Sequence, residues 1–124
     1  MNAYHPAQEY NDLRWGTMMP VPLMIGSHLV QVRARGICSL TVQDVQRLQA
    51  QVPDPDNLTA HVRALLASAM TDVLGELSRE VADVAQLTAV TEQTTRALQS
   101  KLEPKLNALG LQMKAMKIEA IESV

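Results

Sequence analysis

The pattern that most constrains this sequence is an alternation of side-chain type from Leu29 to Val42. Alternate positions in this segment carry apolar or small residues, namely Val30, Val32, Ala34, Gly36, Cys38, Leu40 and Val42. The intervening positions are mostly polar and include Arg33 and Arg35. Because successive side chains of a strand point to opposite faces, this period of two predicts a long strand with one covered face. Gly36 in its middle indicates a bulge or a close neighbour.

Residues 111–121 alternate in the same way and are expected to pair with the first strand. The phase of their alternation slips by one residue near Ala115 and Met116. A one-residue slip turns all later side chains to the opposite face, so we expect either a β-bulge there or a strand that is covered on both faces.

The first segment, residues 3–25, is expected to be mostly irregular. It can form a short strand over residues 10–15. Pro20 and Pro22 lack the backbone N–H that a central strand needs, so residues 20–23 are expected to be an extended edge or connection.

Helices are predicted between the two alternating segments. A short helix is expected from residue 41 or 43 to 51, and a long one from residue 58 to about 77. Another is expected from about residue 88 or 91 to Leu109, before Gly110. Both long helices carry apolar stripes at helical spacing. The predicted fold class is therefore α+β, with a small, mostly antiparallel sheet and two to three helices packed on it.

Composition limits the classes of function. The chain has 124 residues, enough for a single domain, and a formal net charge of -2, which provides no basic field for nucleic acid. Its one cysteine allows neither an internal disulfide nor a cysteine-based zinc site. No leader pattern or membrane-spanning run is visible, so a cytoplasmic location is expected. No cofactor-binding motif is visible either, so no cofactor is expected. The seven methionines are expected to fill the core.

Two residues could carry chemistry, although each has a simpler explanation. Cys38 lies on the apolar side of the long strand, where it would be a small buried hydrophobe. None of the three histidines, including His61, has a partner at metal-ligand spacing. A small ligand-binding or hydrolytic α+β domain that uses Cys38 or His61 is the alternative function.

A row of small residues follows one side of the long helix that begins at residue 58. These residues lie opposite the large apolar side chains and are Ala60, Ala64, Ser68, Thr71 and Gly75. Small side chains allow a second backbone to approach closely, inside the fold or between chains. The other explanation is that alanine simply favours a helix on a wet surface.

Two stretches of sequence resemble a known family. The words Glu9-Tyr10-Asn11-Asp12-Leu13-Arg14-Trp15-Gly16-Thr17 and Pro20-Val21-Pro22 resemble a signature of the SPFH (stomatin, prohibitin, flotillin, HflK/C; band 7) proteins. The bacterial branch concerned is often labelled virion-core-protein-like. The stretch from Val32 to Asp44 resembles that branch too, and so do Leu102-Glu103-Pro104-Lys105-Leu106 and the end of the chain.

The resemblance implies a non-enzymatic, oligomeric scaffold that organises partner proteins, with peripheral membrane contact through regions outside this sequence. It implies no catalytic residues. It also implies that residues 1–124 form a single, partial SPFH domain, because fuller members extend further. Two departures are Cys38, where the family commonly has an aromatic residue, and Val45, where proline is usual. With near-zero net charge and the small-residue row, we expect at least a dimer.

Overall fold

The central element of the fold is β3 (His28–Val42), the strand that the alternation predicts. The computed structural model describes residues 4–124 and pairs β3 antiparallel on both sides. On one side lies β4 (Leu111–Ser123); on the other, β1 (Glu9–Gly16) and β2 (Val21–Ile25) follow each other along β3. The result is a four-stranded sheet in which every other strand depends on β3.

The first segment is more regular than its sequence predicts. The short strand expected over residues 10–15 is confirmed within β1, and the stretch expected to be an extended edge or connection forms β2 from residue 21. β2 tolerates Pro22 because it pairs with β3 alone, so the missing N–H is not required by a second neighbour. Sequence reasoning placed these residues at an edge correctly but missed their pairing.

Two bulges shape β4. The pairing changes register between Leu40–Met113 and Ser39–Ala115, which leaves Lys114 as the extra residue. The predicted bulge is therefore confirmed, one residue before the position expected from the sequence. A second step runs from Gly36–Ile118 to Arg35–Ala120, so a bulge also lies beside Gly36, where the mid-strand glycine indicated a bulge or a close neighbour. Each bulge reverses the alternation, so Met116, Ile118 and Ile121 are all buried although they are unevenly spaced.

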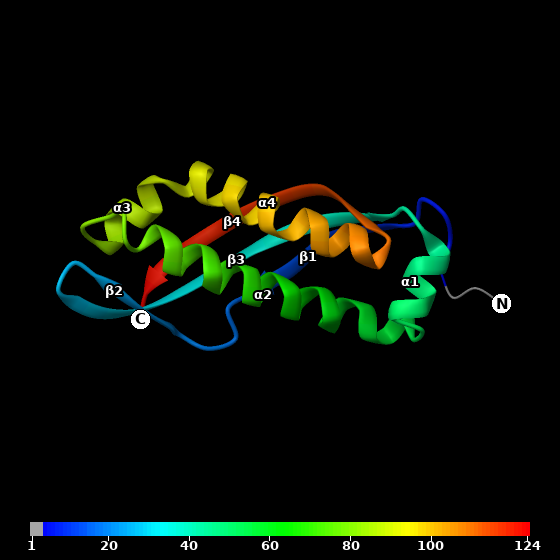
Figure 1. Ribbon diagram of the computed structural model, residues 1–124, viewed down its shortest axis with the longest axis horizontal. Coiled ribbons are helices and arrows are strands. Elements are labelled where there is room, and N and C mark those ends of the chain that lie inside the picture. The colour runs from blue at the N-terminus through cyan, green and yellow to red at the C-terminus, as the bar shows by residue number, and fades with distance from the viewer. Residues whose placement is uncertain (1–3) are drawn as a thin grey trace.

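The helices cover one face of the sheet and leave the other open (Figure 1). The two long ones, α2 (Leu58–Leu77) and α4 (Thr91–Leu109), run in opposite directions across it, α2 against β1 and α4 against β4. The shorter α1 (Val45–Gln51), the single 3-10 turn η1 (Pro55–Asn57) and α3 (Val84–Ala89) complete the chain order. The predicted α+β class is therefore confirmed.

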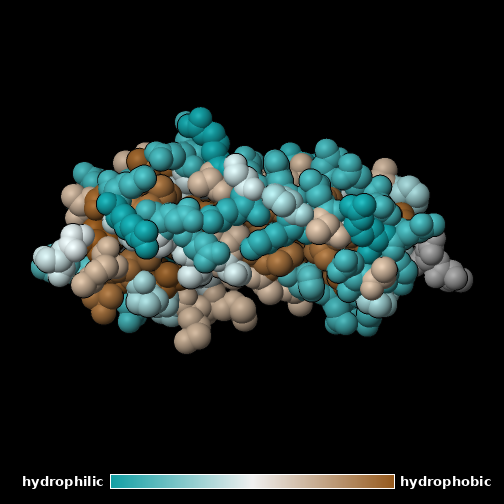
Figure 2. All heavy atoms as spheres, viewed as in Figure 1, coloured by the Kyte–Doolittle hydropathy of each residue, from teal (hydrophilic) through white to brown (hydrophobic). Residues whose placement is uncertain are grey.

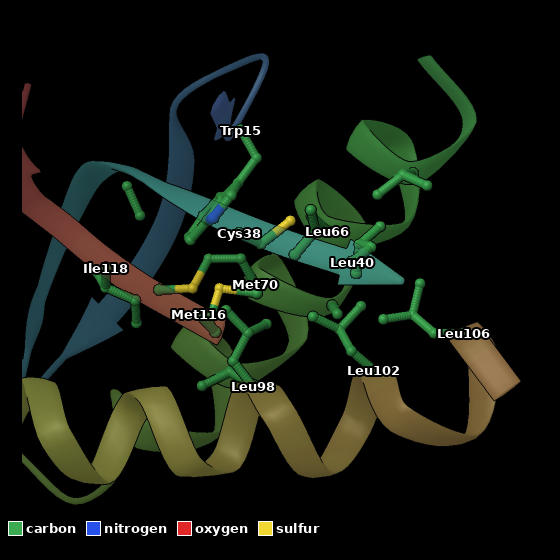
Figure 3. Close-up of a cluster of buried hydrophobic side chains, with 14 of the residues drawn as sticks. Trp15, Cys38, Leu40, Leu66, Met70, Leu98, Leu102, Leu106, Met116 and Ile118 are labelled. Carbon is green, nitrogen blue, oxygen red and sulfur yellow. The ribbon is translucent and has the colours of Figure 1, made fainter. Parts of the chain in front are cut away.

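The core lies between the sheet and the two long helices, as Figure 3 shows. Its side chains come from β3, α2, α4 and β4, and the labelled ones include Cys38, Leu40, Leu66, Met70, Leu98, Leu102, Leu106, Met116 and Ile118. Aliphatic side chains dominate because the sequence has no phenylalanine and only one tryptophan. That tryptophan, Trp15, is 4% exposed and lies across β3.

Trp15 can pack there because its cross-strand partner is Gly36. A Cβ atom placed on Gly36 would lie 2.7 Å from Cζ2 of the indole and would also collide with the carbonyl oxygen of Lys117. The glycine in the middle of the strand is thus explained by close neighbours on two sides, and the bulge that its position also indicated lies beside it.

This contact predicts a large effect of a single methyl group. Gly36→Ala should lower the free energy of unfolding by at least about 1–3 kcal/mol, because the indole and the β4 backbone must both move. Gly75→Ala is the matched control: no atom lies within 4 Å of its added Cβ, so it should raise the free energy of unfolding by about 0.5–1 kcal/mol. Urea unfolding of both variants measures the difference, and equal effects would contradict the packing described.

Candidate functional site

The small residues of α2 lie on its solvent side. Ala60, Ala64, Ser68 and Thr71 are exposed, and Gly75 is partly exposed with open space beside it. The hydroxyl of Thr71 donates a hydrogen bond to the carbonyl oxygen of Ala67 in its own helix, at 2.9 Å. Within residues 4–124, no second backbone therefore packs closely against these small residues. They remain exposed on the surface of the domain.

The opposite side of α2 explains why this row faces outward. Its buried residues recur at helical spacing and are Leu58, Val62, Leu66, Ala69, Met70, Val73, Leu74 and Leu77. They fill the space above β1 and beside α4. Since burial of these large side chains fixes the rotation of the helix, the small residues must point to solvent.

A groove lies beside the first half of this row. It has a volume of about 430 Å³, and α2 forms one wall while the end of β1 and the loop after it form the other. The lining residues are Arg14, Trp15, Gly16, Met18, Ala60, Arg63 and Ala64. Five of these seven residues are apolar or glycine, so the groove combines an apolar surface with two cationic residues.

Methionine side chains flank the groove on the loop between β1 and β2. Met18 is 86% exposed and Met19 is 76% exposed, and Met24 in β2 is also exposed. The prediction that these three methionines fill the core is therefore wrong. Figure 2 shows apolar side chains projecting from the lower edge, where Figure 1 places the β1–β2 loop below α2. Methionine is flexible and polarizable, which suits it to an adaptable binding surface.

A hydrogen bond from Arg63 joins the two walls of the groove. Its Nε donates a hydrogen bond to the carbonyl oxygen of Arg14 at 2.8 Å. This bond occupies an acceptor on the outer edge of β1, which pairs with β3 on its other side. Within residues 4–124, neither Arg14 nor Arg63 has a carboxylate at ion-pair distance, and no acidic residue lines the groove.

The indole nitrogen of Trp15 is unusual in its hydrogen bonding. Its Nε1 is the one buried side-chain nitrogen or oxygen in the described part of the chain without a hydrogen-bond partner. A buried donor left unpaired costs about 1–3 kcal/mol, and proteins rarely leave one.

A second, larger hollow is polar and has a volume of about 600 Å³. It lies where α1, α4 and β4 meet, and Arg47 is its main cation. That guanidinium already donates to the carbonyl oxygen of Asn107 at 2.7 Å and lies 3.7 Å from the carboxylate of Asp44. The positive charge of Arg47 is therefore already engaged in contacts where α1, α4 and β4 meet.

The two residues singled out for chemistry are not brought together. Cys38 is 2% exposed, and burial raises the pKa of its thiol to about 11, so the thiolate is scarce at neutral pH. His61 is exposed on α2 and makes no polar contact with any residue between 4 and 124. In the same range no group of three or more His, Cys, Asp or Glu could hold a metal ion.

Sequence reasoning found the small-residue row but missed the groove. Trp15, Met18 and Arg63 come from a strand, a loop and a helix, and no spacing in the sequence connects them. The one available signal was the apolar pair Met18–Met19 next to a proline, outside any regular apolar pattern.

Comparison with known protein families gives a match over nearly the whole chain. The family model described as SPFH domain-Band 7 family matches residues 3–123. No curated protein matches the chain. Among residues 4–124, no helix combines the length and apolar character needed to cross a membrane.

The buried thiol predicts a dependence of stability on alkaline pH. Between pH about 9 and about 11 the thiol ionises in the unfolded chain while the folded chain keeps its proton. The free energy of unfolding should therefore fall as pH rises through this window, by at most about 1.4 kcal/mol per pH unit from this group. Cys38→Ala should show a shallower slope in urea unfolding from pH 9 to 11. Parallel slopes, or rapid stoichiometric labelling of the native thiol at pH 8, would contradict the burial.

Proposed function

This chain belongs to the SPFH domain-Band 7 family, and from that membership we propose that it is a non-enzymatic scaffold domain whose copies assemble through the exposed face of α2. The family suggests a scaffold-type role. The assembly surface is our own assignment, and it consists of Ala60, Ala64, Ser68, Thr71 and Gly75. We also assign the chain to the virion-core-protein-like bacterial branch, on the sequence words around Trp15 and Gly36.

The observation that carries this proposal is the exposure of the small-residue row along α2. Four of the five side chains are exposed, and the space around Gly75 is open. Helices pack at axis separations of about 8–10 Å, and small side chains at the contact give the closest approach. Two copies related by a twofold axis would present the same row to each other, which makes a self-complementary contact.

The other route to assembly, pairing of free strand edges, has less support. β4 carries two bulges and the exposed residues Lys114 and Lys117, features that discourage edge pairing. On the outer edge of β1, the Arg14 carbonyl oxygen already accepts a hydrogen bond from Nε of Arg63. Neither of these features hinders a contact through the exposed face of α2.

Charge does not oppose assembly. The formal net charge of -2 leaves little repulsion between copies. We propose that the assembled domain organises further proteins in the cytoplasm, with peripheral membrane contact made by regions beyond residues 1–124. In this proposal those residues form a single, partial SPFH domain.

One substitution tests the assembly surface. Ala64→Glu places a charge in the middle of the proposed contact, and burying an unpaired charge should weaken the dimer by about a hundredfold or more. Analytical ultracentrifugation over a range of protein concentrations measures this change. Ala85→Glu is the matched control, because Ala85 is exposed on α3 and lies outside the row.

The outcomes separate the two routes. Dissociation by Ala64→Glu with a normal Ala85→Glu supports the helix face. A dimer that survives both substitutions would assign assembly to the strand edges. A wild-type chain that stays monomeric at all accessible concentrations would refute self-association of these 124 residues.

A further inference from the structure

We infer that the groove between α2 and the β1–β2 loop binds an aliphatic carboxylate, a small molecule with one acid group and an unbranched apolar chain. This assignment goes beyond the scaffold proposal and does not depend on it. It rests on the lining, charge and unpaired hydrogen-bonding groups of the groove.

The shape and lining of the groove suit a small amphiphile. Its volume of about 430 Å³ lies in the range of ligand sites, roughly 300–1,000 Å³, which are mostly apolar with a few polar groups. Ala60 and Ala64 form a low wall on α2, with Met18 and Trp15 opposite. A methylene chain lying between these walls would bury apolar surface that is now wet, and the exposed methionine could fold over it.

The charge of the groove selects an anion. Two arginines and no acidic residue line it, and neither arginine has an ion-pair partner within residues 4–124. The bond from Nε of Arg63 to the Arg14 carbonyl fixes that guanidinium and leaves its two terminal nitrogens without partners in the described chain. Two parallel N–H donors match the two oxygens of a carboxylate.

Trp15 contributes aromatic surface to the groove. The edge of its indole that includes Cε2 and Cζ2 packs against Gly36, so the ring is held in place beside the bound chain. A neutral or cationic ligand with the same chain would leave the arginine charges unpaired.

The sole tryptophan also provides the readout. Sodium decanoate, decan-1-ol and decyltrimethylammonium should be titrated below their micelle-forming concentrations while Trp15 fluorescence is recorded. We expect a saturable change with one decanoate per chain and about tenfold or tighter binding than decanol. Equal response to all three compounds, or no saturable response to decanoate, would overturn the assignment.

Substitutions locate the binding. Arg63→Gln should weaken decanoate binding about tenfold and change decanol binding less than about twofold. Arg96→Gln removes the same charge from the exposed face of α4 and should change neither. Unchanged decanoate affinity in Arg63→Gln, with a normal circular dichroism spectrum, would overturn the assignment.

Two further variants keep the test decisive. Ala64→Leu fills the groove from an exposed helix position, so it should abolish binding of both decanoate and decanol even if Arg63→Gln fails to fold; retained binding would overturn the proposal. Thr71→Glu lies outside the groove but inside the proposed assembly surface, so it should bind decanoate at least as tightly as the unsubstituted chain. An acidic amphipathic peptide that saturates the Trp15 signal more tightly than decanoate would assign the groove to a protein partner instead.

Discussion

The contact between Trp15 and Gly36 is the constraint on which the rest of the structure depends. The indole occupies the space that a side chain at position 36 would need, and the Lys117 carbonyl closes the same space from the other neighbouring strand. Three strands therefore meet at one residue without a side chain. Because β3 is, within residues 4–124, the only strand paired on both sides, this meeting point sets how β1 and β4 approach it. It also places the indole beneath α2, where it becomes part of the groove lining.

A second glycine fixes the far end of the helical layer. Gly110 has a φ of 90°, in the left-handed region, and ends α4 just before β4 begins. Its carbonyl oxygen accepts hydrogen bonds from the N–H groups of Gln43 and Asp44, at 2.8 and 3.0 Å. The end of β3, the start of α1 and the end of α4 are thus joined at one peptide.

Periodic burial could be predicted from the sequence, and contacts between distant segments could not. The strand at residues 29–42, the core stripe of α2 and the helix end at Gly110 follow from local spacing, and all three are confirmed. The pairing of β2 and the exposure of Met18 depend on neighbours far away in the chain. The groove is formed by a strand end, a loop and a helix. The only feature of the sequence that indicated it was therefore the apolar pair Met18–Met19 beside a proline.

The two proposed surfaces share residues, which links them energetically. Ala60 and Ala64 belong both to the assembly row and to the groove lining. A chain packed against these alanines and a second copy packed against the same positions would compete for one space. Linkage then requires that each lower the affinity of the other by the same factor. If both proposals hold, an aliphatic acid would bind the separated domain more tightly than the assembled one, and its concentration would set the fraction of free scaffold subunits. Coupling of this kind needs no conformational change, because the overlap of the two surfaces is sufficient.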